Sequence, residues 1–342
     1  MSQATTLPAL PARRKNRSVW RRFGSVTRSP VGMIGLVLVL LALICAFGAE
    51  VLAPHDPTQI NVRGRLLPPA WDAEGDPTFL LGTDQLGRDL LSRLIFGSRI
   101  SVTVGVAGVL VSLVIGVGLG LLSGYVGGFI DALISRVLDT FMAIPFILLA
   151  LAVVGVLGPR SGNGLITLII VLGLTGWVTF ARVVRGEVLA VKQREYVEAA
   201  RSIGQRDLWI VLRHVLPNVT ASIIVLSTLQ IATVIIAESS LSFLGLGVQP
   251  PTITWGTMLS EGRDHLATSW WLATFPGIAI SLTVLGTILL GDWLRDVLDP
   301  ADDVGWGLGI GDSVLLSRSL PQHDHFCLLI CHCRVCTPAT AG

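Results

Sequence analysis

Charged residues are scarce in this chain of 342 residues. Only 14% of its residues are Asp, Glu, Lys or Arg, whereas a soluble domain usually carries about 25%. Hydrophobic residues make up 51% of the chain, and the mean hydropathy is +0.70. This balance excludes an ordinary soluble domain and indicates a protein with several membrane-spanning segments.

The motifs of several enzyme classes are also missing. The chain has no G-x-x-x-x-G-K-[ST] string for binding the phosphates of a nucleotide and no H-E-x-x-H zinc motif. Residues 309–312, GIGD, match the short G-x-G-D string of intramembrane aspartyl proteases. That chemistry needs two aspartates that face each other inside the membrane, and Asp139 has no comparable string around it. We therefore expect no enzymatic activity and no bound cofactor.

Cysteine is scarce as well, with five residues in the chain. Cys45 falls in an apolar run, and the other four lie within the last 16 residues. This distribution provides no disulfide framework. Cys333 and Cys336 form one C-x-x-C pair, whereas structural zinc sites usually combine two such pairs, so we expect no metal site.

Six apolar runs are long enough, or nearly so, to cross a bilayer, which requires roughly 20 residues. They are residues 31–52, 101–122, 133–157, 165–180, 219–236 and 271–290. The third run contains Asp139 and Pro145, and the second is rich in glycine, which suits close packing of helices in lipid. The sequence therefore predicts an all-α polytopic membrane protein with six transmembrane helices.

The basic residues predict the orientation of these helices. Most of the 25 Lys and Arg residues fall on segments that share one side of the membrane with both termini, and such segments are normally cytoplasmic. The predicted parts are a basic cytoplasmic segment, residues 1–30, the first helix with a long external loop, residues 31–96, a five-helix core, residues 97–300, that contains a cytoplasmic loop, residues 185–217, and an atypical tail, residues 301–342.

Two acidic residues lie in or near the apolar runs, where an unpaired charge is costly. Asp139 follows Arg136 by three positions, so we expect the two side chains to pair on one face of a helix. Glu238 either marks the outer end of the fifth run or lines a pathway through the membrane. The sequence leaves both interpretations open.

Two segments outside the runs also carry patterns. The end of the external loop, residues 84–96, has leucines at helical spacing, which predicts an amphipathic helix with Asp84 as its N-cap. Trp255, Trp270 and Trp271 cluster before the last run, as expected for an aromatic belt at the membrane surface.

The cytoplasmic loop predicts two short helices joined by a glycine. In the first, Tyr196, Ala199, Ala200 and Ile203 recur on one face, and Gly204 suits a left-handed C-terminal cap.

The second helix is expected to open at Asp207 and to end or kink at Pro217. Its apolar side is expected to consist of Leu208, Val211, Leu212, Val215 and Leu216. Two such short helices are marginal on their own and must pack against something. A groove on a partner protein and the lipid surface are both compatible with the pattern.

This loop resembles the EAA motif of bacterial ABC-transporter permeases, through Glu198-Ala199-Ala200, Gly204 and Leu216-Pro217. His214 stands where the general consensus has an aliphatic residue, as is often so in the peptide-transport branch. Three more stretches resemble the "C" subunits of dipeptide, oligopeptide and nickel permeases: RSPVGMIGLVLVLL, LLGTDQLGRDLLSRLIFGSRISVTVG and SFLGLGVQPPTITWGTML. The resemblance covers about residues 15–300.

The resemblance implies one permease subunit of an ATP-driven importer in the bacterial inner membrane. The partners it implies are a related permease, two cytoplasmic subunits that bind the ATP, and an external substrate-binding protein, with no nucleic acid. The implied ATPase-coupling residues are Glu198, Ala199, Ala200, Ile203, Gly204, Leu216 and Pro217. Members of this branch carry dipeptides, oligopeptides, nickel chelates or glutathione, and no residue here identifies the substrate. A stand-alone channel or secondary carrier is the alternative from another class.

The tail, residues 301–342, extends beyond the resemblance. Its composition changes abruptly and its end is rich in Cys and His. We expect a disordered extension, and translation in a shifted reading frame is the alternative.

Overall fold

The computed structural model describes residues 29–161, 164–249 and 251–298. The predicted basic segment, up to residue 28, and the tail lie outside these residues. Within the described ranges the chain is helical and has no β-strand beyond one isolated bridge between Thr83 and Asp89. The predicted all-α class is confirmed.

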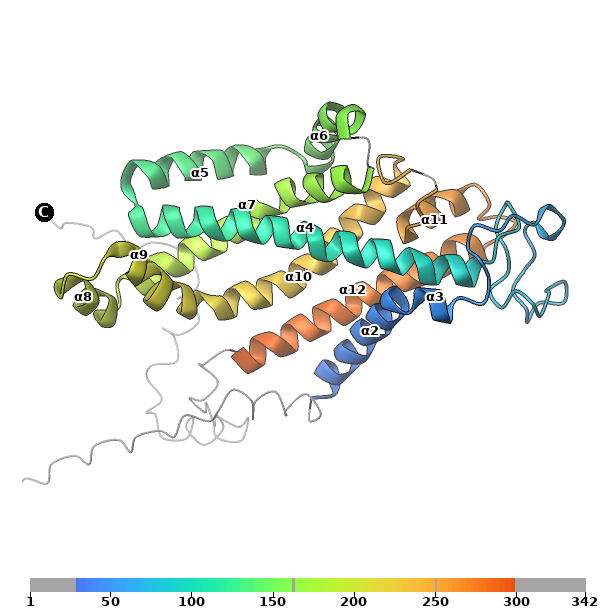
Figure 1. The fold of residues 1–342 in the computed structure, drawn as a ribbon, viewed down its shortest axis with the longest axis horizontal. Coiled ribbons are helices and arrows are strands. Elements are labelled where there is room, and N and C mark those ends of the chain that lie inside the picture. The colour runs from blue at the N-terminus through green and yellow to red at the C-terminus, as the bar shows by residue number, and fades with distance from the viewer. Residues whose placement is uncertain (1–28, 162–163, 250, 299–342) are drawn as a thin grey trace, which may run out of the picture. The chain divides into compact units, whose positions relative to one another are not determined.

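The described residues form eleven α-helices, which Figure 1 labels in chain order. They are α2 (Pro30–Phe47), α3 (Ala49–Leu52), α4 (Leu90–Val126), α5 (Gly128–Ala143), α6 (Phe146–Ser161), α7 (Gly164–Lys192), α8 (Glu195–Ser202), α9 (Asp207–Ile210), α10 (Leu216–Phe243), α11 (Trp255–Arg263) and α12 (Trp271–Leu298). A 3₁₀ turn covers Val62–Gly64, and a π-helical turn covers Val211–Val215.

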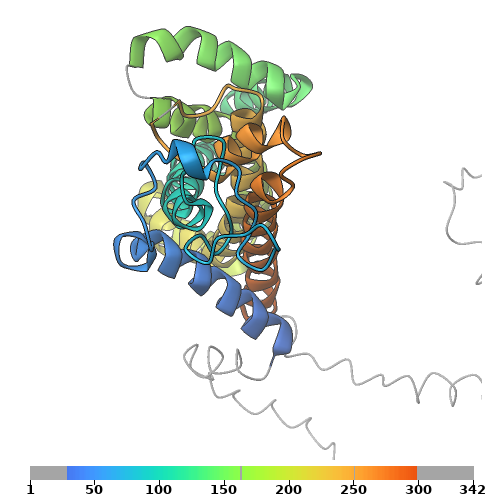
Figure 2. The same cartoon turned by 90° about the vertical axis from the view of Figure 1, so that its right-hand side faces the viewer.

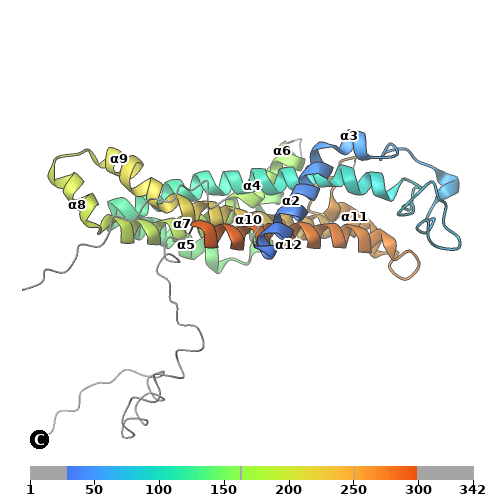
Figure 3. The ribbon, with the colours of Figure 1, turned by 90° about the horizontal axis from the view of Figure 1, so that it is seen from below.

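Five stretches of the described residues are long and apolar enough to span a membrane: α2, α4, α7, the stretch Asp207–Phe243 and α12. The bent pair of α5 and α6 makes a sixth if it is counted as one span. Figure 3 shows α2 crossing the other long helices obliquely. The prediction of six spans therefore holds when this pair is included.

The third predicted span is bent rather than straight. The axes of α5 and α6 differ by 98°. Pro145 explains the break, because it has no backbone N–H to donate and it disfavours helical geometry at Ile144, which is extended with φ −91° and ψ 124°. In Figure 1, α5 runs lengthwise beside α4 and α6 is seen almost end-on, whereas Figure 2 shows α6 lengthwise.

The centre of the bundle is the pair α4 and α7, which pack closely along a row of glycines. A Cβ atom on Gly116 would lie 2.5 Å from the carbonyl oxygen of Trp177. One on Gly120 would lie 2.8 Å from that of Ala181. Since Cβ atoms do not approach other atoms so closely, only glycine allows the two backbones to meet in this way.

Helix α4 begins at Leu90 and runs for 37 residues without a break. Its N-cap is Asp89, whose carboxylate accepts a hydrogen bond from the backbone N–H of Ser92 at 3.0 Å. The prediction of Asp84 as the cap was wrong. Asp84 instead accepts hydrogen bonds from the backbone N–H groups of Leu86 and Arg88 and so closes the preceding turn.

The predicted aromatic belt is wrong for two of its three tryptophans. Trp255 and Trp271 are buried, and Trp270 is exposed. The indole N–H of Trp255 donates to the carbonyl oxygen of Leu94 at 2.9 Å, and that of Trp271 donates to Thr83 at 3.2 Å. These bonds make the burial possible, because a buried indole N–H needs an acceptor.

Candidate functional site

The segment that resembles the EAA motif forms a helical hairpin, α8 and α9, between the long helices α7 and α10. Figure 1 places this hairpin at one end of the bundle, whereas residues 53–89 and α11 lie at the opposite end. Figure 3 shows the same separation. We call residues 195–210 the hairpin. We call the opposite end of the bundle, which contains residues 53–89 and α11, the loop end.

Gly204 ends α8 as predicted. Its φ is +78°, in the left-handed region that favours glycine. The N–H of Gly204 bonds to the carbonyl oxygen of Arg201, and the N–H of Gln205 bonds to that of Ala200. This pair of bonds is a Schellman cap, which satisfies the last carbonyl groups of the helix and turns the chain sharply.

The buried face of α8 differs from the predicted stripe. Val197 and Ala200 are buried among core residues, whereas Ile203 is 83% exposed and Tyr196 is 39% exposed. Ala199 is exposed as well. Of the predicted stripe, only Ala200 is therefore buried, and its other three residues stay exposed because the core lies against the neighbouring face of the helix.

The second helix opens at Asp207 as predicted, but its N-cap is Arg206, whose side chain makes no capping bond. Ile210 and Val215 are buried, whereas Leu208 is 70% exposed and Leu212 is also exposed. The predicted apolar side is thus divided between the core and the surface.

Pro217 lies in the first turn of α10 and does not end the helix. The stretch Asp207–Phe243 continues through the π-helical turn Val211–Val215. In that turn the N–H of Leu216 bonds to the carbonyl oxygen of Val211, five residues earlier. This wider turn lets the chain pass a proline, which cannot donate a backbone hydrogen bond.

His214, the residue that departs from the motif, lies in the π-helical turn and contacts both α8 and the turn that follows α8. Its Nε2 lies 3.2 Å from the side-chain oxygen of Gln205, next to the glycine cap. Its ring centroid is 6.3 Å from that of Tyr196 in α8. An aliphatic residue here could not make the hydrogen bond, so His214 contributes to holding the turn.

Large apolar side chains remain exposed on the hairpin and the turn after it. We call them the outer face, and they are Tyr196, Ile203, Leu208, Trp209 and Leu212. The charged side chains of Glu195, Glu198 and Arg201 lie beside them and are also exposed. A group of exposed apolar residues with a polar rim is typical of a surface that binds another protein or a membrane.

The sequence patterns did not identify Tyr125, which supports the hairpin from the end of α4. Its hydroxyl donates to the Asp207 carboxylate at 2.5 Å and lies 3.4 Å from Nη2 of Arg201, which donates to it. The latter bond raises the pKa of the Arg201 guanidinium. Lys192 donates to the backbone carbonyl of Tyr125 at 2.6 Å. The available signal was that the chain has only two tyrosines.

The predicted ion pair between Asp139 and Arg136 is wrong. Asp139 pairs with Arg182 of α7, with Oδ1 and Nη2 3.2 Å apart. The pairing follows from the packing of α5 along α7, which brings the two side chains together across 43 positions of sequence.

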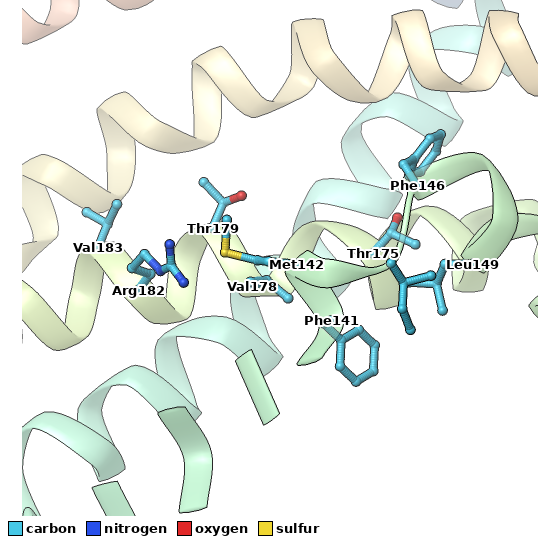
Figure 4. A pocket seen from close by; sticks show the side chains of 10 residues that line it. Phe141, Met142, Phe146, Leu149, Thr175, Val178, Thr179, Arg182 and Val183 are labelled. Carbon is cyan, nitrogen blue, oxygen red and sulfur yellow. The ribbon is translucent and has the colours of Figure 1, made fainter. Parts of the chain in front are cut away.

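A small hollow of about 250 Å³ lies beside the bend between α5 and α6 (Figure 4). Figure 4 shows Phe141 and Met142 from α5, Phe146 from α6, and Thr179 and Arg182 from α7 around it. Its volume is below the range of about 300–1,000 Å³ that is usual for small-molecule sites. We therefore attribute the hollow to the break at Pro145 and do not assign it as a substrate site.

Glu238 lies fully buried in α10. Its carboxylate accepts hydrogen bonds from the hydroxyl groups of Ser242 at 2.8 Å and Ser101 at 3.3 Å. The Ser101 hydroxyl also accepts from the backbone N–H of Trp255, the first residue of α11. The acid thus connects α4, α10 and α11. A role for Glu238 in lining the pathway stays a prediction.

A buried ion-pair cluster joins the parts of the loop end. Arg93 of α4 pairs with Asp84, which lies in the loop of residues 53–89, and, at 2.8 Å, with Glu261 of α11. Arg88 pairs with Asp84 at 2.6 Å and with Glu261 at 3.4 Å. The cluster ties the loop and α11 to the first turn of α4.

The fold defines the class of protein. Two solved structures of the MetNI methionine ABC transporter, in inward-facing conformations, match this chain with TM-scores of 0.52 and 0.53 at 19% identity. The matches cover 60% and 61% of this chain and 96% and 98% of the other. The chain has the fold of an ABC importer permease.

The family follows from the sequence matches. The family of binding-protein-dependent transport system inner membrane components matches residues 116–301, and the N-terminal TM domain of oligopeptide transport permease C matches residues 16–69. The chain belongs to this family of inner membrane components. It is a multi-pass inner-membrane protein of a transporter permease family, and the resemblance inferred from the EAA motif is confirmed.

Three similar proteins are also transport permeases. The chain is 44% identical to a di/tripeptide transport system permease protein, DppC, of Pseudomonas aeruginosa, over 78% of this chain and 86% of the relative. It is 42% identical to the dipeptide permease DppC of Haemophilus influenzae, over 78% and 90%. It is 44% identical to the glutathione transport permease GsiD of Pectobacterium atrosepticum, over 83% and 90%.

Proposed function

We propose that this chain is a permease subunit of an ATP-driven importer of di- and oligopeptides. The names of its relatives support small peptides as the substrate class, since dipeptides, tripeptides and glutathione share a peptide backbone with charged ends. A second, related permease would complete the translocation pathway. The chain itself supplies no catalytic residues, and partner subunits bind the ATP.

The hairpin is the part that receives energy from ATP in this proposal. The observation that carries it is the outer face, where Ile203 and Leu208 are 83% and 70% exposed on a segment held by a glycine cap. Two cytoplasmic ATPase subunits would serve the complex, one on each permease. Docking into a groove of an ATPase would remove these apolar side chains from water and stabilise the complex.

The orientation follows from the same proposal. Both termini and the hairpin face the cytoplasm, and the loop end faces outward, where an external substrate-binding protein delivers the peptide. The excess of Lys and Arg on the hairpin side of the membrane supports this orientation. The conformational change is then driven by differences in ATPase contact between the inward- and outward-facing states.

The test uses the complete complex in proteoliposomes with ATP inside the vesicles on the ATPase side. Uptake of radiolabelled dialanine, glutathione and nickel chloride is measured with the corresponding external binding protein. We expect ATP-dependent uptake of a peptide. Uptake of nickel alone would overturn the substrate class, and equal uptake without the ATPase subunits would indicate a carrier or channel.

A further inference from the structure

Tyr125 contacts both helices of the hairpin and the end of the helix that precedes it. It is the second-last residue of α4 and is buried. Its contacts reach Lys192 at the end of α7, Arg201 in α8 and Asp207 at the start of α9. We infer that Tyr125 is a positioning residue that sets the orientation of the hairpin relative to α4 and so couples hairpin movement to the membrane helices.

The hydroxyl group makes the connection to the two hairpin helices. It donates to Oδ1 of Asp207 at 2.5 Å and accepts from Nη2 of Arg201 at 3.4 Å. The bond to Asp207 is short and its acceptor is charged, so it is stronger than a hydrogen bond between neutral groups. One side chain thus holds α8 and α9 to a third helix that is distant in sequence.

The ring and the backbone add further contacts. The Arg201 guanidinium lies 5.8 Å and the Lys192 ammonium 5.6 Å from the centroid of the Tyr125 ring, within the range of cation–π attraction. Lys192 also donates to the carbonyl oxygen of Tyr125, near the negative end of the α4 dipole. The end of α7 and the end of α4 are therefore joined just where the hairpin begins.

Besides the buried Val197, Ala200 and Ile210, Tyr125 supplies polar contacts that hold the hairpin in its orientation. Helix α8 has eight residues, and a helix of this length is unstable alone. Gly204 between α8 and α9 gives the turn its geometry, and a Cβ at that position would meet no other atom within 4 Å.

Movement of the anchored hairpin reaches the far end of the bundle through α4. This helix is one element of 37 residues, about 55 Å long, and its glycine row packs directly on α7. Its first turn carries Arg93 of the ion-pair cluster at the loop end. A displacement at Tyr125 therefore displaces α4 as a body.

This inference rests on the proposed function, because the task of Tyr125 is to orient a hairpin that docks on an ATPase. The test uses the complete complex with its binding protein in proteoliposomes. The measured quantity is dialanine imported per ATP hydrolysed. Co-purification of the ATPase subunits reports assembly separately.

The variants are Tyr125→Phe, Asp207→Ala and Asp207→Asn, with Thr103→Val as the matched control. The Thr103 hydroxyl is exposed on the same helix and bonds only to the carbonyl oxygen of Arg99 in its own helix. Tyr125→Phe and Asp207→Ala should lower the import ratio several-fold while the ATPases still co-purify. Asp207→Asn should keep most of the ratio, because its amide oxygen still accepts from Tyr125, and Thr103→Val should leave it unchanged.

Combining Tyr125→Phe with Asp207→Ala should reduce the ratio no further than the stronger single variant, since both remove the same Tyr125–Asp207 hydrogen bond. A normal ratio for Tyr125→Phe would overturn the inference. If that variant does not assemble, equal ratios for Asp207→Ala and Asp207→Asn would overturn it instead.

A separate measurement distinguishes failure of the proposed docking. Ile203→Cys, with the native cysteines replaced by serine, should form cross-links to an ATPase subunit in the otherwise unaltered complex. Absence of the cross-link would overturn the docking of the hairpin itself. A cross-link together with a normal ratio for Tyr125→Phe would overturn only the role of Tyr125.

Discussion

Arg93 and Glu261 stand 168 positions apart in the chain, and their side chains form an ion pair of 2.8 Å at the loop end. The Arg93 side chain is 2% exposed and also pairs with Asp84, which is equally buried. This pair joins α4 to α11, and Asp84 adds the loop of residues 53–89. The three parts therefore behave as one unit.

Replacing Arg93 should destabilise this unit. Arg93→Met should lower the free energy of unfolding by about 3 kcal/mol, at the low end for a broken buried ion pair, because Arg88 still pairs with Asp84. Thermal unfolding of the purified complex in detergent measures the change. Arg99→Met is the control, since Arg99 and its partner Glu50 are both largely exposed and such pairs contribute little. Equal melting temperatures for the two variants would contradict the role of the cluster.

The glycine row between α4 and α7 gives a second prediction. Gly116→Ala places a methyl group 2.5 Å from the Trp177 carbonyl oxygen, so the helices must move apart, at a cost of about 1–3 kcal/mol. Gly118→Ala, on the same helix, meets no atom within 4 Å and should be neutral or slightly stabilising. Thermal unfolding of both variants is the measurement, and a tolerated Gly116→Ala would show that the packing is looser than described.

The cap at Gly204 gives a third prediction. Gly204→Ala forces a Cβ into a backbone with φ +78°, which costs about 1–2 kcal/mol, and Gly204→Pro should be worse because proline requires a negative φ. Both should reduce peptide import per ATP hydrolysed. Gly204→Asn should do less harm, because asparagine adopts this conformation more readily. If Gly204→Pro imported peptide normally in an intact complex, the capped turn would have no part in coupling.

The outer face gives a fourth prediction. Ile203→Asp should leave folding unchanged, since the side chain is already exposed, but it should weaken co-purification of the ATPase subunits. Introducing a charge into a docked apolar contact carries a desolvation cost. Val62→Asp makes a comparable change at an exposed position at the loop end and should leave ATPase binding intact. Retention of the ATPase by both variants would argue against docking at the outer face.

Some of these features were predictable because their causes are local. The length of the apolar runs set the membrane class, and Pro145 alone accounts for the break between α5 and α6. Gly204 predicted the end of α8, because the left-handed backbone at a helix end favours glycine whatever surrounds it. The family could be predicted from the EAA residues because a motif is defined by residues close together in the sequence.

Other features depended on contacts between distant parts of the chain. Helical spacing predicted an ion pair between Asp139 and Arg136, but α5 packs along α7 and Asp139 pairs with Arg182 instead. Spacing also could not show which face of α8 is buried, or that Tyr125 anchors the hairpin across 82 positions. The sequence by itself determined the membrane fold, the family and the place of the hairpin. Only the tertiary structure decided the partners of its charged and polar groups, because these depend on which helices lie side by side.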